Sequence, residues 1–389
     1  MNAVYVPGNR VNLLETGAEY FPALLAEIEQ ACREIYLETY MFADDDTGLR
    51  VSQALIRAAQ RGVAVHVMVD GFGAREFPNR LGQKMSAAQV NVLVYRPDLA
   101  PHRFRRHKLR RLHRKLSVID GRVAFVGGIN VIDDHEAQGD SSPRFDYAVR
   151  IEGPLVPTVR QAMLHLWRLV SWVRLRRRTA SRVFAVARET MGDVDAALVI
   201  RDNLRHRRDI ENAYLAAITS ARNEVIIANA YFLPGWRFRH ALMDAAARGV
   251  RVVLLLQGRI EYVVLHFATQ ALYGSLINAG VQIYEYHRSF LHAKVAVVDG
   301  HWATVGSSNI DPFSLLLARE ANVLVQHAGF AEQLRSSLIE SLASGGKEVK
   351  KADLARTPWW QRFLRWSAYG VMRLAVGLAG YGAGRDYGR

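Results

Sequence analysis

The chain has 389 residues, of which 51 are Lys or Arg and 37 are Asp or Glu, so its formal net charge is +14 with neutral histidines. Half of the residues are hydrophobic and 23% are charged, which excludes an intrinsically disordered or fibrous protein. The single cysteine excludes an internal disulfide and a cysteine-based zinc cluster. The first ten residues lack a secretory-signal pattern, and no run of about 18 apolar residues predicts a membrane-spanning helix. We therefore expect a soluble or peripherally membrane-bound protein of about two domains.

Strand-like and helix-like patterns alternate along the chain. In its first part, apolar runs at 35–42, 63–69 and 90–95 alternate with helical patterns at 48–60 and 80–89. A later part repeats this order, with strands expected at 224–232, 250–256 and 281–286 and helices at 236–248 and 266–279. Such alternation predicts an α/β sandwich with largely parallel strand pairing.

Two stretches of eighteen residues repeat each other without a gap. His113–Asn130 reads HRKLSVIDGRVAFVGGIN, and His292–Asn309 reads HAKVAVVDGHWATVGSSN. The offset is 292 − 113 = 179 residues, and nine of the eighteen positions are identical. A weaker match of 59–71 with 246–258 lies upstream of each copy. The chain is therefore a tandem duplication, with one unit before about residue 170 and one after about residue 195.

A histidine and a lysine two positions apart open both copies. On a strand, residues i and i+2 lie on one face, so His113 and Lys115 point the same way, as do His292 and Lys294. A single strand histidine is usually a satisfied core residue, but duplication of the pair favours a functional role. The chain has only seven lysines against 51 − 7 = 44 arginines, yet both copies keep lysine. A lysine ammonium is a compact charge that suits one phosphate oxygen beside a nucleophile.

Each copy also contains an Asp-Gly pair. Asp120 and Asp299 follow the motif histidine by seven positions, an odd offset that places them on the other face of a regular strand. Asp-Gly is in addition a strong signal for a tight hairpin turn. A structural turn role therefore stands beside a catalytic role for both aspartates.

The two copies resemble the HKD motif, H-x-K-x4-D followed by G-x-x-N, of the phospholipase D superfamily. The resemblance covers residues 10–345, and the tail and compact length resemble the bacterial cardiolipin synthases of the B type, which lack N-terminal transmembrane helices. It implies two α/β/α sandwich domains with mixed sheets, related by a pseudo-twofold axis, with the active site at their interface. The implied segments are a first domain at 1–172, a basic connector at 173–195, a second domain at 196–345 and a tail at 346–389.

The resemblance also implies phosphodiester chemistry without a metal or cofactor. One imidazole attacks phosphorus to give a phosphohistidine, and the other protonates the leaving alkoxide and later deprotonates the incoming alcohol. By analogy His113 is the nucleophile and His292 the acid and base, although the near-symmetry makes these roles exchangeable. The implied catalytic residues are His113, Lys115, Asp120, His292, Lys294 and Asp299.

Four further residues are implied to bind phosphate or to orient the histidines. Asn130 and Asn309 end the two copies and would surround the phosphoryl oxygens with the lysines. Asp146 and Glu320 match the positions of carboxylates that reach across to the histidine of the other unit. A charge at the end of a strand is the alternative for both, because their gaps after the motif asparagine differ: 146 − 130 = 16 against 320 − 309 = 11.

Positive charge is concentrated in clusters at 102–115, 174–182 and 201–208, which predicts a polyanionic partner or a solvated face. The tail at 347–376 combines Lys and Arg with Trp359, Trp360 and Trp366, a composition typical of the boundary between lipid headgroups and acyl chains. A helix packed on the protein's own core is the alternative. We expect anionic phospholipid, phosphatidylglycerol and cardiolipin, and a membrane surface as partners, and no nucleic acid.

The resemblance implies transfer of a phosphatidyl group between two phosphatidylglycerol molecules, giving cardiolipin and glycerol. The alternatives are a hydrolase or nuclease of the same superfamily and an inactive binding module. The expected location is the cytoplasmic face of a bacterial inner membrane, and the residues leave the oligomeric state open.

Overall fold

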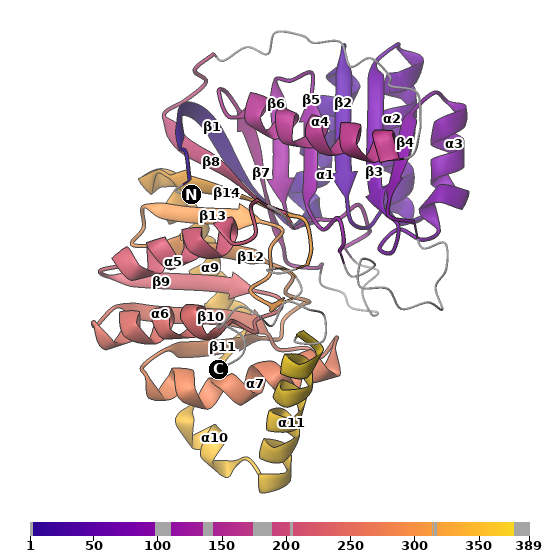
Figure 1. Ribbon diagram of the computed structural model, residues 1–389. Coiled ribbons are helices and arrows are strands. Elements are labelled where there is room, and N and C mark those ends of the chain that lie inside the picture. The colour runs from indigo at the N-terminus through magenta and orange to yellow at the C-terminus, as the bar shows by residue number, and fades with distance from the viewer. Residues whose placement is uncertain are drawn as a thin grey trace.

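A computed structural model describes residues 3–97, 110–134, 143–173, 189–202, 205–312, 314 and 317–376. The expected α/β class is confirmed: the described strands form a single 15-stranded sheet with helices on both faces (Figure 1). Most of the cluster at 102–115 and all of that at 174–182 lie outside the described residues.

The elements before residue 174 make up the first half of the molecule. They are β1 (Val6–Glu15), α1 (Thr16–Gln30), β2 (Glu34–Thr39), α2 (Asp46–Gln60), β3 (Ala64–Asp70), the short 3-10 helix η1 (Phe77–Asn79), α3 (Leu81–Ala87), β4 (Asn91–Tyr95), β5 (Lys115–Ile119), β6 (Val123–Gly127), β7 (Tyr147–Glu152) and α4 (Val156–Val173).

The elements after residue 188 make up the second half and a C-terminal extension. They are β8 (Val194–Arg201), α5 (Asp209–Ser220), β9 (Glu224–Asn229), α6 (Trp236–Ala247), β10 (Arg251–Gln257), α7 (Val263–Asn278), β11 (Gln282–Tyr286), β12 (Lys294–Val298), β13 (Trp302–Gly306), β14 (Glu320–Gln326), α9 (Ala328–Gly345), β15 (Gly346–Glu348), α10 (Lys351–Arg356) and α11 (Trp359–Val376).

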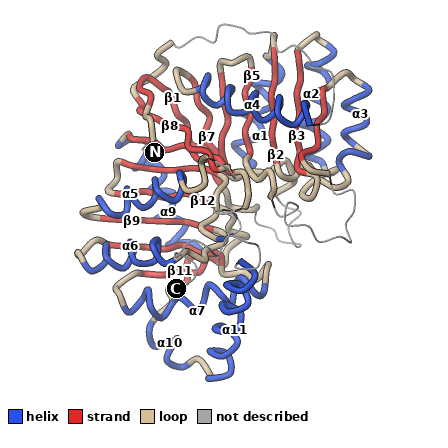
Figure 2. The backbone as a smooth tube through the Cα atoms, viewed as in Figure 1, coloured by secondary structure: helices blue, strands red, loops and turns tan. Residues whose placement is uncertain are grey.

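The strand order shows the duplication in three dimensions. From the centre outward, the first half runs β1-β7-β6-β5-β2-β3-β4, and the second runs β8-β14-β13-β12-β9-β10-β11. These are the same order of equivalent strands, and β1 and β8 join the halves as an antiparallel pair. Strands of the two halves run in different directions in Figure 1, and loops gather where their ends meet (Figure 2).

The expectation of largely parallel pairing is wrong. Parallel pairs occur only within β2-β3-β4 and β9-β10-β11, and the other pairs among the described strands are antiparallel. The strands of each parallel group are joined by helical crossovers, whereas β5 and β6, like β12 and β13, are joined by a tight hairpin, which requires antiparallel pairing. The sequence patterns also fail to predict four of the observed elements: β1, α1, β8 and α5.

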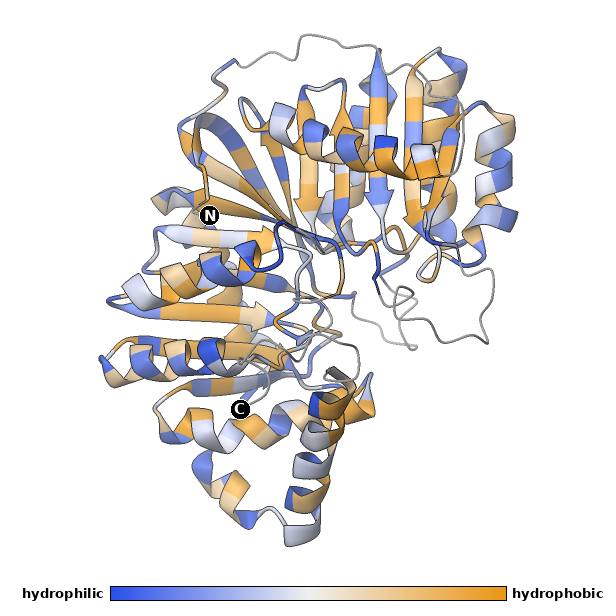
Figure 3. Cartoon of the chain, in the orientation of Figure 1, coloured by the Kyte–Doolittle hydropathy of each residue, from blue (hydrophilic) through white to orange (hydrophobic). Residues whose placement is uncertain are grey.

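Alternating side chains of the sheet fill cores on its two faces. On β2, Ile35 and Leu37 pack in the core that contains α1 and α2, whereas Tyr36 faces the opposite core. That opposite core contains α4 and α9 and is continuous across both halves. Because both faces are covered, the strands read as nearly continuous apolar runs, visible as orange segments in Figure 3. The shared core holds the halves together and so keeps the two motifs in a constant relation.

Candidate active site

The two motifs meet where the halves pair with each other through short backbone bridges. The backbone N–H of His113 donates to Arg319 O at 3.0 Å, and that of Arg319 donates to Arg111 O at 2.7 Å. In the other half, the N–H of His292 donates to Phe145 O at 2.7 Å, and that of Phe145 donates to Phe290 O at 2.9 Å. Arg319 and Phe145 each stand one residue before a carboxylate. These bridges therefore bring each carboxylate beside the histidine of the opposite half.

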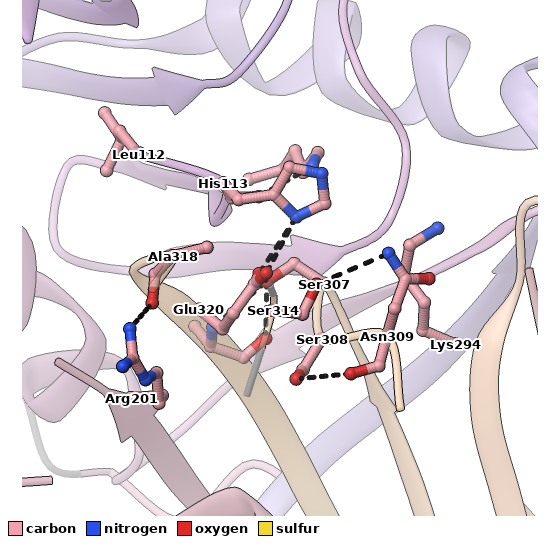
Figure 4. Close-up of polar contacts among 12 residues, drawn as sticks. Leu112, His113, Arg201, Lys294, Ser307, Ser308, Asn309, Ser314, Ala318 and Glu320 are labelled. Atoms are coloured by element: carbon pink, nitrogen blue, oxygen red, sulfur yellow. Dashed lines mark hydrogen bonds and ion pairs between the residues drawn. The ribbon is translucent and has the colours of Figure 1, made fainter. Parts of the chain in front are cut away.

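Each motif histidine contacts an acid from the other half. His113 Nδ1 lies 2.9 Å and 3.1 Å from the two carboxylate oxygens of Glu320, and Figure 4 shows its ring directed at them. His292 Nδ1 lies 2.6 Å from Asp146 Oδ2. A carboxylate that faces Nδ1 holds the neutral imidazole with its proton on that nitrogen and its lone pair on Nε2. Both rings are thus oriented to use Nε2 in chemistry.

The two lysines are buried beside the histidines. Lys115 Nζ donates to His113 O at 2.6 Å, and Lys294 Nζ lies 3.6 Å from Asp146 Oδ2 and 2.9 Å from His292 Nδ1. Burial lowers the pKa of Lys115 to about 7, although Glu320 opposes this shift. Burial likewise lowers the pKa of Lys294 to about 8, opposed chiefly by Asp146. An ammonium held in such a site favours binding of an anion, which would restore its charge balance.

The titratable groups of both motifs form one electrostatic cluster. Burial lowers the pKa of His113, an effect that Glu320 opposes. Burial and then the Lys294 ammonium lower the pKa of His292 well below its ordinary value, and His113 itself contributes. Burial raises the pKa of Asp146, opposed first by Lys294. Both imidazoles are therefore neutral in the resting protein near pH 7.

The motif asparagines lie in corresponding loops but make different contacts. Asn130 Oδ1 accepts a hydrogen bond from the N–H of Met41 at 3.1 Å. Asn309 Nδ2 donates to Ser314 Oγ at 3.5 Å, and its buried Oδ1 has no partner among the described residues. The amide of Asn130 thus holds backbone in this state, whereas part of the Asn309 amide is unused.

The structure does not bring Asp120 and Asp299 to this cluster, which corrects the prediction that they are catalytic. Both occupy left-handed backbone at the first turn position, with φ of 52° and 51°, and each is followed by a glycine that also has positive φ. The Asp120 carboxylate accepts three backbone N–H bonds of 2.8–2.9 Å from residues 32–34, and Asp299 accepts three from residues 222–224. These contacts tie the hairpin to the segment before β2 or β9, as the turn alternative requires.

Two polar residues near the histidines are not among the predicted site residues. Ser307 donates from Oγ to Glu320 Oε2 at 2.5 Å. Asp70 is fully buried, accepts the N–H of Leu112 at 2.8 Å and so holds the chain just before His113. The signal for Ser307 was its place at the position of Gly128 in the other copy, and that for Asp70 was a charge closing a buried strand.

Among the described ranges, no group of three or more His, Cys, Asp or Glu side chains is arranged to hold a metal ion. Over the same ranges, none of the helices combines the length and apolar character needed to cross a bilayer.

Comparisons with known proteins agree with this geometry. The profile of the family described as "Cardiolipin synthase, PLD-like domain" matches residues 24–167 and 214–342. The chain is 40% identical over 381 residues to cardiolipin synthase B of Escherichia coli K12, covering 98% of this chain and 92% of that protein. It is 29% identical over 363 residues to the major cardiolipin synthase ClsA of Bacillus subtilis, covering 92% and 74%.

A solved structure has the same fold. The crystal structure of phosphatidylserine synthase from Haemophilus influenzae superposes with a TM-score of 0.72 at 13% sequence identity, covering 98% of this chain and 97% of that one. At this identity the likeness concerns the fold alone.

Proposed function

The chain belongs to the family of cardiolipin synthases built from PLD-like domains, and from this premise we propose that it transfers a phosphatidyl group from one phosphatidylglycerol to another, giving cardiolipin and glycerol. Domains at 1–172 and 196–345 would supply one motif each. The relatives do not favour the hydrolase or nuclease that the sequence left open. The observation that carries the mechanism is the contact of each motif histidine with an acid from the opposite half.

In the first step, Nε2 of His113 attacks the phosphorus of the donor lipid. The P–O bond to glycerol breaks, and the leaving oxygen takes a proton from His292, which must be protonated in this complex. Glu320 stabilises the positive charge that develops on His113 as the P–N bond forms. Lys115 and Lys294 face the phosphoryl oxygens, on which negative charge increases in the transition state. Asn309, whose buried amide oxygen has no partner among the described residues, would help to orient the substrate.

In the second step, His292 removes a proton from the hydroxyl of the acceptor lipid. The alkoxide oxygen bonds to phosphorus, and the P–N bond to His113 breaks. Water can attack the same intermediate, so the cleft must favour a lipid alcohol over water. That competition makes the product itself the test of the function.

Incubation of the protein with labelled phosphatidylglycerol vesicles should therefore give cardiolipin and free glycerol. The His113→Ala variant is the matched control and should give neither. Phosphatidic acid as the main product would reject the synthase and leave the phosphohistidine mechanism standing. Turnover by the His113→Ala variant would reject His113 as the nucleophile.

The enzyme would meet its substrate at the cytoplasmic face of the bacterial inner membrane, with α11 as one contact. This helix packs along α7 (Figure 1), but it does so through Ala368, Tyr369 and the buried Met372. Its tryptophan side chains point outward: Trp359 is 80% exposed and Trp366 is 58% exposed. An aromatic face turned to solvent, with arginines between the rings, fits the headgroup region of an anionic bilayer.

Vesicle sedimentation tests this contact. Trp359→Ala combined with Trp366→Ala should weaken binding to phosphatidylglycerol vesicles, and Trp236→Ala on α6 is the control, because Trp236 is also exposed but lies on another helix. Equal binding by all three proteins would remove α11 as a membrane contact.

A further inference from the structure

One cation beside the catalytic cluster has no place in the mechanism above. Arg144 lies two residues before Asp146, and its guanidinium is 4.8 Å from the centre of the Phe290 ring. Its Nε is buried and has no hydrogen-bond partner among the described residues. The side chain is half-buried and forms no salt bridge with a carboxylate of the described residues, although its charge lowers the pKa of Asp134 and Asp146 against the larger effect of their burial. Such a group is suited to an anionic ligand.

Arg144 lies on the His292 side of the cluster. Phe290, on which it stacks, is two residues before His292 and in ring contact with it, with centroids 6.5 Å apart. Burial is the main cause that lowers the pKa of Lys294 and His292, and the charge of Arg144 adds to both shifts. The guanidinium is therefore close to the group that acts on the acceptor hydroxyl.

The His113 side of the cluster is built differently among the described residues. The position that matches Phe290 holds Arg111, because 290 − 179 = 111. Arg111 forms an ion pair with the buried Asp70 at 3.8 Å and also stacks on Phe72. Its charge is thus already balanced within its own half. The two sides of the cleft differ in their capacity for a second anion.

The acceptor of the proposed reaction is itself a phosphodiester. Its reacting hydroxyl and its phosphate sit on the same glycerol headgroup, so its negative charge must lie within one headgroup of His292. In the proposed mechanism Lys115 and Lys294 already bind the phosphate of the donor lipid. A neutral alcohol or water, by contrast, brings no second charge to the cleft.

We propose that Arg144 binds the phosphodiester of the acceptor lipid and thereby selects an anionic glycerophospholipid, rather than water, as the group that attacks the phosphohistidine. This inference rests on the proposed function. Phe290 stacks on one face of the guanidinium, and a guanidinium held by its face can make a bidentate contact with phosphate oxygens through its edge. In the reaction His292 takes the hydroxyl proton, the new P–O bond forms, and the bond to His113 breaks, while Arg144 remains unchanged.

The test separates the acceptor from the donor through the ratio of products. Labelled phosphatidylglycerol vesicles are incubated with each enzyme in dilute ethanol, and cardiolipin is compared with the sum of phosphatidic acid and phosphatidylethanol. All three products share the donor step, so the ratio reports the acceptor alone and is independent of the fraction of folded enzyme. Arg144→Gln should lower the ratio about tenfold to a hundredfold, the effect of losing a charge-assisted contact.

Two controls complete the design. Arg144→Lys keeps the charge without the planar fork and should give an intermediate ratio. Arg57→Gln removes an exposed arginine that pairs with Glu29 on the outer helices and should leave the ratio unchanged.

Several results would overturn the inference. The first is a ratio of cardiolipin to the other two products in Arg144→Gln that equals the ratio of the unaltered enzyme. This holds even if the total rate falls, because an equal fall in all products assigns Arg144 to the donor step. Loss of every product in both Arg144 variants has the same meaning. Failure of the unaltered enzyme to make cardiolipin would instead reject the proposed function.

Discussion

The two histidine sites come from one duplicated motif, yet their acids differ in surroundings. Glu320 receives the Ser307 hydroxyl at 2.5 Å in addition to His113. Asp146 lies against Gly128, where any Cβ would stand 2.3 Å from its Oδ1, so no serine fits in that half. One acid thus accepts a hydrogen bond from a serine hydroxyl, whereas the other accepts the backbone N–H of Tyr147 at 2.8 Å. The two copies of the motif therefore hold histidines whose partner carboxylates have different hydrogen-bond donors.

The two motif lysines also differ in their surroundings. Both lysines donate to the carbonyl of their own motif histidine, but Lys294 also lies against Nδ1 of His292, whereas Lys115 Nζ lies 5.5 Å from the centre of the Tyr40 ring. The His113 side chain is 17% exposed and that of His292 is 7% exposed. The more accessible imidazole is the one to which we assign the attack on phosphorus.

The strongest test of the comparison removes each imidazole in turn. His113→Ala and His292→Ala should each lower cardiolipin formation by at least about 10³-fold, as for loss of a nucleophile or its general acid–base partner. With a phosphatidyl ester of p-nitrophenol, whose leaving group needs no proton, His292→Ala should accumulate a phosphatidyl adduct that intact mass spectrometry detects. His113→Ala should not. The opposite pattern would exchange the two roles, and His165→Ala, on the exposed side of α4, is the control.

Ser307→Gly makes the second half resemble the first. Loss of the hydroxyl donor to Glu320 should slow phosphoenzyme formation about tenfold, since one hydrogen bond to a charged group contributes about 1.5–3 kcal/mol. Rapid-quench measurement with the p-nitrophenyl ester reports that step. Ser307→Thr retains a hydroxyl and should recover most of the rate. An unchanged rate in the glycine variant would mean that Ser307 has no part in holding Glu320.

The buried lysines predict opposite trends of activity and stability with pH. Burial places the pKa of Lys115 at about 7 and that of Lys294 at about 8, so kcat/KM should fall as pH rises through this range and the ammonium charges are lost. The unfolded chain keeps its lysines protonated to about pH 10.4 and therefore binds more protons than the folded chain above pH 7. These two groups thus make the free energy of unfolding increase from pH 7 to 10.

Titration of kcat/KM and of denaturant unfolding checks both trends. The increase in stability should be smaller in Lys115→Met, which removes the group that titrates first. Equal pH dependence of unfolding in that variant and the unaltered protein would contradict the assignment.

The smallest catalytic effect is expected at the two turn aspartates. Asp120→Asn and Asp299→Asn replace an anion that accepts three backbone N–H bonds, and each should lower the free energy of unfolding by about 1–3 kcal/mol. The value of kcat per folded molecule should stay unchanged, because neither carboxylate reaches the histidines. Chemical denaturation with parallel active-enzyme titration separates the two quantities. A large fall in kcat at unchanged stability would restore a catalytic role for these residues.

Much of the fold was predictable because its signals are local. Apolar runs and helical spacing predicted β2 to β4 and β9 to β11 with the helices between them, and the glycine-rich turns ended them near the observed residues. The pairing direction was not predictable from alternation, since hairpins at Asp120 and Asp299 insert antiparallel strands between the crossover units. Strand β1 was missed because Pro7 and Gly8 stand near its start and the polar Asn9 occupies a buried position of its alternation.

The sequence by itself determined that the chain is doubled and that each half carries a histidine and a lysine on one face of a strand. That information is local: a strand repeats every two residues wherever it lies. Only the tertiary structure decided which acid meets which imidazole, since 207 and 146 residues separate the partners along the chain. The tertiary structure likewise decided that Asp120 and Asp299 lie away from the histidines and that Arg144 lies beside them. Contacts of this range depend on how whole layers pack, and packing is a property of the assembled cores rather than of any segment.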